Sequence, residues 1–312
     1  MRLLDGVRFA VGTLSVFPVR GGRVDREVAG QAMILAPAVG VVLGAVAGLP
    51  LFLPVPALLG AALSLGLLAV LTRGLHLDGL ADLADGLGSG KPAEQALAIM
   101  KKSDIGPFGV MALVFTLLVQ AAALAEAGFA ALVTACLAGR LMLTWACRAR
   151  VPAARPDGLG AMVAGTVRPS APWLVTVAAL LASAFIGLTV DLRVWERESA
   201  AWLTGSDVRA EGRQEGEFLT PGLKYADQPA SADAWMGVVS GTTPWTGPYP
   251  GATGLGLPAS LTLPLGLLTG LGAAMLLLRR AGRRLGGITG DVLGALVETA
   301  AAAALVACAI LG

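Results

Sequence analysis

Apolar residues run along this chain in long blocks that alternate with shorter polar connections. Blocks close to the ~20 residues needed to cross a bilayer recur along the sequence. They lie at 29–49, 55–72, 107–126, 128–147, 171–190, 255–278 and 291–311. We therefore expect an all-α, polytopic helical membrane protein with about seven transmembrane helices.

The basic residues predict how these helices cross the membrane. The connections at 50–54 and 127 carry none, whereas the segments at 73–106, 148–170 and 279–284 each hold several. The segment before the first block is also basic. Lys and Arg collect in cytoplasmic loops, so we expect a cytoplasmic N-terminus, a cytoplasmic acidic loop at 73–106 and an external C-terminus.

One stretch, 191–254, is long and polar. Its second half is rich in Gly, Pro and Thr, which favours turns over a packed core. Alternation of the helices puts this stretch outside, and long loops translocate largely regardless of their charge. We expect 1–312 to form a single integral membrane domain, with 191–254 as a polar extracytoplasmic insertion.

The composition agrees with a membrane protein. Of the residues, 55% are hydrophobic and only 14% are charged, well under the roughly 25% of soluble domains. Cys136, Cys147 and Cys308 lie in apolar blocks without metal-type spacing, so we expect them to pack among helices. The short apolar stretch at 7–19 lacks a cleavage site and predicts an interfacial or re-entrant segment.

The residues that suggest chemistry gather after the second block. Asp78, Asp82 and Asp85 are spaced four and then three residues apart, so on a helix they share one face. Like charges stacked this way repel, and no Lys or Arg stands between them, so a divalent cation is the expected compensation. Mg²⁺ prefers carboxylate oxygens and often bridges to substrate phosphates. The alternative is an amphipathic interfacial helix whose acids only face water.

The same loop continues into a second candidate element. Lys101 and Lys102 precede Ser103, Asp104 and a glycine-containing helix start. Lysines and free backbone N–H groups there suit a phosphate. Alternatively, the lysines only anchor a cytoplasmic loop, and Ser103 or Asp104 caps the next helix with Pro107 in its first turn.

Single ionisable or hydroxyl residues elsewhere add candidates. His76, the only histidine, is either a base or a structural group. Arg140 and Glu298 fall inside predicted helices, where a charge should face the bundle interior, and we expect Arg140 to pair with an acid of the 78–85 run. Thr289 is a candidate substrate contact, and Asp291 is either a metal ligand or an N-cap. The four arginines between 279 and 284 either hold substrate phosphate or set topology and contact anionic lipid.

The run LHLDGLAD at 75–82, followed by ADG at 84–86, resembles the signature of the cobalamin-5′-phosphate synthase family, also called adenosylcobinamide-GDP ribazoletransferases. The segments at 103–109 and 287–291 resemble two further motifs of that family, in the same order. The resemblance covers most of the chain outside 191–254. At 102–104 this chain reads Lys-Ser-Asp where many members read Asp-Ser-Arg or similar, so the acid is displaced by two positions.

The resemblance implies a Mg²⁺-dependent transferase of the bacterial inner membrane, with its active site on the cytoplasmic side. Its substrates would be adenosylcobinamide-GDP and α-ribazole or its 5′-phosphate. GMP would leave, and adenosylcobalamin or its 5′-phosphate would form. We also expect the lipid bilayer as a partner and expect no nucleic acid to bind. Whether the chain forms a homo-oligomer is left open.

We assign the candidate residues to three roles. The metal candidates are Asp78, Asp82, Asp85, Asp104 and Asp291. The catalytic candidates are Asp82, Asp85 and His76, and the substrate-binding candidates are Lys101, Lys102, Ser103, Arg140 and Thr289.

Two other classes compete with this interpretation. A CDP-alcohol phosphotransferase or a prenyltransferase would use the same metal chemistry, but the acidic run lacks the Ala-Arg pair of the CDP-alcohol family. A transporter would place its ionisable residues near the bilayer midplane on broken helices, whereas these acids cluster in a loop.

Overall fold

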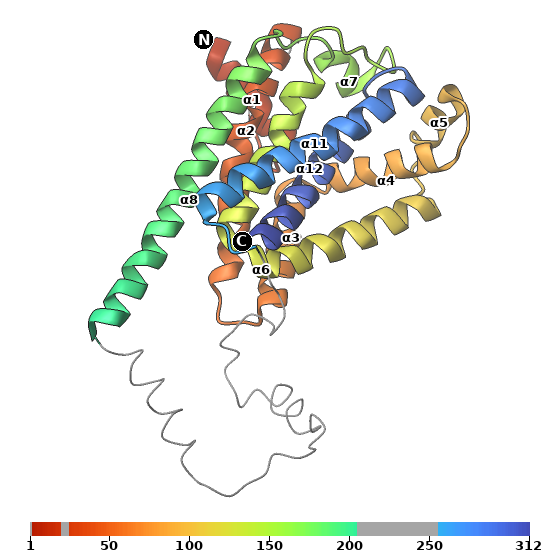
Figure 1. The fold of residues 1–312 in the computed structure, drawn as a ribbon. Helices are drawn as coiled ribbons and strands as arrows, with labels where there is room; N and C mark the ends of the chain where they lie inside the picture. The colour runs from red at the N-terminus through yellow and green to blue at the C-terminus, as the bar shows by residue number, and fades with distance from the viewer. Residues whose placement is uncertain (1, 20–24, 205–254) are drawn as a thin grey trace, which may run out of the picture. The chain divides into compact units, whose positions relative to one another are not determined.

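The computed structural model of the chain describes residues 2–19, 25–204 and 255–312. Over these ranges it is helical, and it has two isolated β-bridges but no strand. The all-α prediction is therefore confirmed. In chain order the elements in Figure 1 are α1 (Arg2–Leu14), α2 (Arg26–Ala47), the 3₁₀-helix η1 (Leu49–Phe52), α3 (Ala57–Leu71), α4 (Leu75–Gly88), α5 (Ala93–Ile99), α6 (Pro107–Ala146), α7 (Gly158–Val163), α8 (Ala171–Thr204), α11 (Ala259–Leu285) and α12 (Gly290–Leu311).

Five helical segments are long and apolar enough to cross a membrane. They are Arg26–Phe52, Pro107–Ala146, Ala171–Glu196, Ala259–Leu285 and Gly290–Leu311. The pair α3 and α4, bent by 90°, would make a sixth if it crossed as one span. A multi-pass membrane protein is thus confirmed, but the predicted count of seven is not. The predicted spans 107–126 and 128–147 correspond to the two helical arms of α6, which meet at a kink at the non-helical Gly128 (φ 73°, ψ −167°).

Exposed apolar side chains mark a surface suited to lipid. On α8, four large side chains are each between 65% and 69% exposed: Trp173, Leu174, Leu181 and Phe185. A row of this kind on a soluble protein would be an aggregation liability, whereas a bilayer covers it. The helix continues to Thr204, so the polar insertion predicted to start at 191 begins as helix. Its remainder, 205–254, lies outside the described residues.

By its internal contacts the chain divides after Val190, and the described residues 2–19, 25–190 and 255–312 belong to the first unit. The first unit contains every candidate site residue. In it α1 packs on α2, burying Ala10 and Leu14 and leaving Leu4 exposed. This two-sided character is that of an interfacial helix.

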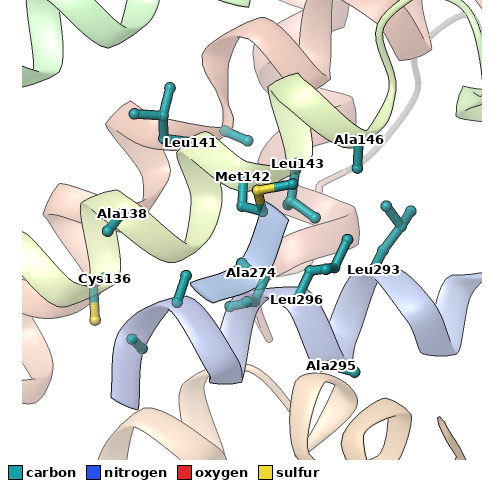
Figure 2. Close-up of a cluster of buried hydrophobic side chains, with 14 of the residues drawn as sticks. Cys136, Ala138, Leu141, Met142, Leu143, Ala146, Ala274, Leu293, Ala295 and Leu296 are labelled. Atoms are coloured by element: carbon teal, nitrogen blue, oxygen red, sulfur yellow. The ribbon is translucent and has the colours of Figure 1, made fainter. Parts of the chain in front are cut away.

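The core of the first unit is built around α12, which packs against α6, α11 and α4. Figure 2 shows Met142 and Leu143 of α6 together with Leu293 and Leu296 of α12. Small residues bring the backbones close, as is common between membrane helices. A Cβ on Gly139 of α6, for example, would lie 2.9 Å from the carbonyl oxygen of Val297 in α12. The three cysteines are free and buried, as predicted.

The position of α4 follows from a sharp corner and a close crossing. Arg73 (φ 56°) and Gly74 (φ 65°) adopt left-handed backbone conformations and turn the chain out of α3. Beyond the corner, Gly79 lies against the first turn of α12, and Gly294 of α12 lies against His76. Since α4 has only 14 residues and bends by 90° from α3, it is shorter than the ~20 residues that a spanning helix needs. We therefore assign α4 to the region outside the spanning segments.

Candidate active site

A cavity of about 280 Å³ opens where α4, α7, the loop after α6 and the start of α12 meet. Ionisable side chains from α4, the loop after α6 and the start of α12 line it: His76, Asp78, Arg155, Asp157 and Asp291. Glycines complete the wall on the α7 and α12 sides. Glycine lets a ligand approach the backbone closely, so this cavity suits a ligand with polar groups.

Asp78 of α4 and Asp291 of α12 line this cavity, and Asp82 of α4 does not. Asp78 is exposed and Asp82, one turn further on, is half-buried. Burial and the negative charges of Asp78, Asp291 and Asp85 raise the pKa of Asp82 to about 6, against a smaller lowering by Arg155. The negative charges around Asp82 therefore outweigh the positive charge of Arg155.

The donor set fits a hard divalent cation that keeps much of its water. Among the described residues, no three His, Cys, Asp or Glu side chains lie close enough together to form a complete metal site. Mg²⁺ does not require such a cage, since it is usually held by one or two carboxylates, several waters and substrate phosphates. Asp78, Asp82 and Asp291 offer carboxylates of that kind.

Asp85 makes contacts other than those predicted. Its Oδ2 accepts a hydrogen bond from the backbone N–H of Gly106 (2.7 Å), and its Oδ1 accepts one from Gly109 (2.9 Å). The carboxylate thus caps the start of α6, where unpaired N–H groups favour a negative charge. Pro107 lies in the first turn as predicted.

The expectation that Ser103 or Asp104 caps α6 is wrong. Both residues are exposed, and the N-cap residue, Gly106, has no side chain to accept a hydrogen bond. Asp85 can reach the helix start from α4 because Gly106 and Gly109 leave room for it. A Cβ on either glycine would lie 2.5 Å from a carboxylate oxygen of Asp85.

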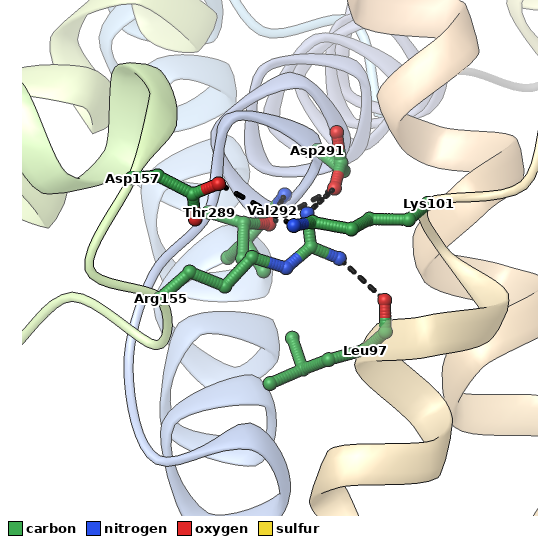
Figure 3. A network of polar contacts seen from close by, with 7 residues as sticks. All are labelled: Leu97, Lys101, Arg155, Asp157, Thr289, Asp291 and Val292. Carbon is green, nitrogen blue, oxygen red and sulfur yellow. Dashed lines mark hydrogen bonds and ion pairs between the residues drawn. The ribbon is translucent and has the colours of Figure 1, made fainter.

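Arg155 is the site residue that sequence reasoning missed. Its Nη1 lies 3.7 Å from Oδ2 of Asp291, and its Nη2 donates to the carbonyl oxygen of Leu97 (2.6 Å), as Figure 3 shows. Two backbone hydrogen bonds place it there: Ala154 N–H to Ile288 O and Ile288 N–H to Pro152 O, both 3.0 Å. In the sequence, Arg155 is one of several bases in a predicted cytoplasmic loop, and no local signal distinguishes it.

Thr289 and Lys101 complete the polar network in Figure 3. The Thr289 hydroxyl accepts from the N–H of Val292 and donates to Oδ2 of Asp291, both at 3.2 Å. Thr289 is therefore the N-cap of α12, and the N-cap alternative for Asp291 is wrong. Lys101 is exposed at the rim, with its Nζ 3.4 Å from Oδ2 of Asp157. Lys102 is also exposed, and neither it nor Asp104 lines the cavity.

His76 and Arg140 form a buried pair beneath the cavity. Nη2 of Arg140 lies 3.4 Å from Nδ1 of His76, so the predicted acid partner of Arg140 is wrong. Arginine only donates, so Nδ1 accepts and the ring proton lies on Nε2. Burial and the Arg140 charge lower the pKa of His76 well below its ordinary value. Nε2 has no partner among the described residues, so His76 offers the cavity a donor.

Glu298 lies inside the bundle as predicted. It accepts a hydrogen bond from Nε2 of Gln120 at 3.0 Å, and both side chains are buried. The bond joins α6 to α12 away from the cavity, because neither residue lines it.

Comparison with known proteins shows the family. A family model described as cobalamin-5-phosphate synthase matches residues 6–309. An adenosylcobinamide-GDP ribazoletransferase of Frankia casuarinae is 36% identical over 316 residues, covering 96% of this chain and 92% of that protein. One from a Nocardioides species is 45% identical over 195 residues, covering 60% of this chain and 83% of that protein. No solved structure matches. The chain belongs to the cobalamin-5-phosphate synthase family.

Proposed function

We propose that this chain is a membrane adenosylcobinamide-GDP ribazoletransferase. It transfers cobinamide phosphate from adenosylcobinamide-GDP to the 5′ oxygen of α-ribazole or its 5′-phosphate and releases GMP. The observation that carries the proposal is the family match over residues 6–309, which include every residue of the acidic cavity. The match favours this transferase over a CDP-alcohol phosphotransferase, a prenyltransferase or a transporter.

The reaction breaks the phosphorus–oxygen bond to GMP and forms one to the acceptor 5′ oxygen. Negative charge grows on the transferring phosphoryl group and on GMP, so catalysis consists of positioning and charge stabilisation. Bound Mg²⁺ would supply the positive charge that offsets both groups. Asp78, Asp82 and Asp291 are the carboxylates we propose to hold it.

Two side chains can donate hydrogen bonds to phosphate oxygens in this cavity. Arg155 keeps its charge at every relevant pH and reaches the cavity beside Asp291. His76 lines the same cavity, and its buried Nε2–H has no partner among the described residues. We assign them to binding the diphosphate. Lys101, Lys102 and Ser103 are exposed on the α5–α6 connection, and Lys101 pairs with Asp157, which lines the cavity.

We assign the proton of the attacking hydroxyl to a carboxylate of the site. His76 carries its proton on Nε2 in this tautomer and Arg155 only donates, so neither accepts one. A group suited to general-base catalysis has a pKa near the working pH. Without Mg²⁺ the pKa of Asp82 is raised to about 6, and a bound Mg²⁺ would lower it, so Asp82 would act as the base only while it does not coordinate the ion. Asp85 acts by holding α6 next to this group, and its predicted role as a metal ligand stays a prediction.

We place the active site on the cytoplasmic side of a bacterial inner membrane. The support is the alternation of basic and bare connections along the sequence. The cavity is lined by α4, the loop after α6 and the start of α12, which lie in or directly after the basic segments at 73–106, 148–170 and 279–284.

A direct assay tests the proposed function. Purified protein in detergent is supplied with adenosylcobinamide-GDP, α-ribazole and Mg²⁺, and GMP is measured over time. We expect GMP release that requires both substrates and stops when Mg²⁺ is chelated. Absence of GMP with both α-ribazole and its 5′-phosphate would show that the proposed activity is wrong.

A further inference from the structure

A second cavity, of about 430 Å³, lies outside the active site. It is formed by the C-terminal half of α11, the loop after α6 and residues 286–288. It shares no lining residue with the acidic cavity. The paired backbones of Pro152 and Ile288 stand between the two, since Ile288 lines one cavity and Thr289 the other.

Four arginines line this second cavity, and no acid does: Arg148, Arg150, Arg279 and Arg283. Arg279 and Arg283 are four residues apart on α11 and therefore share a face, where like charges repel. No described residue forms an ion pair or a side-chain hydrogen bond with any of the four. The cavity thus gathers four positive charges without a counter-ion among residues 2–19, 25–204 and 255–312, which favours an anionic ligand.

Two of these arginines are held in unusual settings. The guanidinium of Arg148 lies 5.4 Å from the ring centroid of Trp145, a cation–π contact that fixes its direction. Arg150 adopts a left-handed backbone conformation (φ 77°). Such conformations are strained for residues other than glycine and recur at ligand sites. A loop kept in this state suits a built binding site better than a solvated turn.

The rest of the wall identifies the kind of anion. Met275 and Leu278 continue the cavity along α11 into its membrane-spanning part. The cavity is therefore basic at the helix end and apolar towards the bilayer. Basic pockets of this kind between membrane helices bind phosphate headgroups of anionic lipids. We propose that the cavity binds an anionic phospholipid, with its phosphate on the four arginines and an acyl chain along Met275 and Leu278.

The test uses two matched double variants of the full chain. Arg279→Gln with Arg283→Gln removes two charges that line the cavity. Arg280→Gln with Arg284→Gln removes two charges from the same end of α11 that do not line it. Each purified protein is titrated in neutral detergent with phosphatidylglycerol or phosphatidylcholine, and bound lipid is counted by native mass spectrometry. Thermal unfolding in phosphatidylcholine checks that each variant is folded.

We expect wild type to prefer phosphatidylglycerol. Loss of Arg279 and Arg283 should weaken that binding about 30-fold, from the contribution of two arginines near a membrane surface. The single variant Arg279→Gln should weaken it about fivefold, and the Arg280 and Arg284 pair should have little effect.

Three outcomes would overturn the proposal. Equal retention of both lipids by wild type would mean that no anionic lipid site exists. An equal loss in both double variants would mean diffuse attraction to a basic surface. Displacement of phosphatidylglycerol by inorganic phosphate or adenosylcobinamide-GDP would assign the cavity to a soluble phosphate compound.

Discussion

Gly79 of α4 packs directly against the backbone of Asp291 in the first turn of α12. A Cβ at Gly79 would lie 2.7 Å from the carbonyl oxygen and 2.9 Å from the Cα of Asp291, closer than atoms pack. The missing side chain is what lets the acids of α4 and α12 share one site.

Substitution of Gly79 by Ala should therefore disturb the site more than the fold. The added methyl group meets backbone, which cannot move aside, so α4 must shift. We expect a loss of about 1–3 kcal/mol in unfolding free energy, as for overpacked cores, and about 100-fold slower GMP release, as for misplaced catalytic groups. The control is Gly272→Ala in α11, where a Cβ meets nothing within 4 Å. It should leave rate and stability near wild type.

Substitutions at Asp85 and Asp82, three residues apart on α4, should change the stability of the protein in opposite directions. Asp85→Ala leaves the N–H groups of Gly106 and Gly109 without their acceptors. We expect it to cost about 1–3 kcal/mol of stability, since it removes a cap and leaves buried donors unpaired. Asp85→Asn keeps one acceptor oxygen and should cost less. Thermal unfolding in detergent measures both, and an unchanged midpoint for Asp85→Ala would contradict the capping role.

Asp82→Asn should stabilise the protein in Mg²⁺-free buffer at pH 7.5. The pKa of Asp82 is raised to about 6 in the fold, above its unfolded value, so the folded state binds more protons between these values. Wild type therefore gains stability as pH falls through about 6, and this gain ends below the unfolded pKa. The variant lacks the gain. Unfolding midpoints of both proteins at pH 7.5 and 5.0 give the comparison, and a variant less stable than wild type at pH 7.5 would refute it.

Arg155→Gln should slow GMP release about 100-fold, the effect of losing one fixed donor to a developing negative charge. Arg155→Lys should recover part of the rate, because a lysine keeps the charge but not the forked geometry that reaches both Asp291 and Leu97. Lys101→Gln, an exposed rim residue, serves as the comparison and should lose less than tenfold. Equal effects at Arg155 and Lys101 would argue for general electrostatic attraction only.

The sequence predicts what depends on local spacing. The apolar block at 291–311 is α12 to within one residue, and the spacing of Asp78, Asp82 and Asp85 predicts a helix, which α4 is. Prediction from the sequence fails where segments that are far apart in the chain meet in the fold. Asp85 turns to α6 because that helix begins beside it.

The same limit applies to the buried and loop residues of the site. Nothing near Arg140 in the sequence indicates that its partner is His76, because α4 and α6 meet only in the fold. Arg155 enters the site through backbone pairing of two loops that are far apart in the chain. An isolated sequence shows which residues carry charge, whereas the crossing of helices decides which charges meet.

The central claim is that carboxylates at the α4–α12 crossing hold Mg²⁺ where the diphosphate bond breaks. The most direct test is the rate of GMP release as a function of Mg²⁺ concentration, for wild type, Asp82→Asn and the exposed α5 control Glu94→Gln. We predict that Asp82→Asn needs much more Mg²⁺ and loses at least about 100-fold in rate, more than is typical for groups that only support a metal ligand. Glu94→Gln should follow wild type. An Asp82→Asn curve that coincides with wild type would contradict the account.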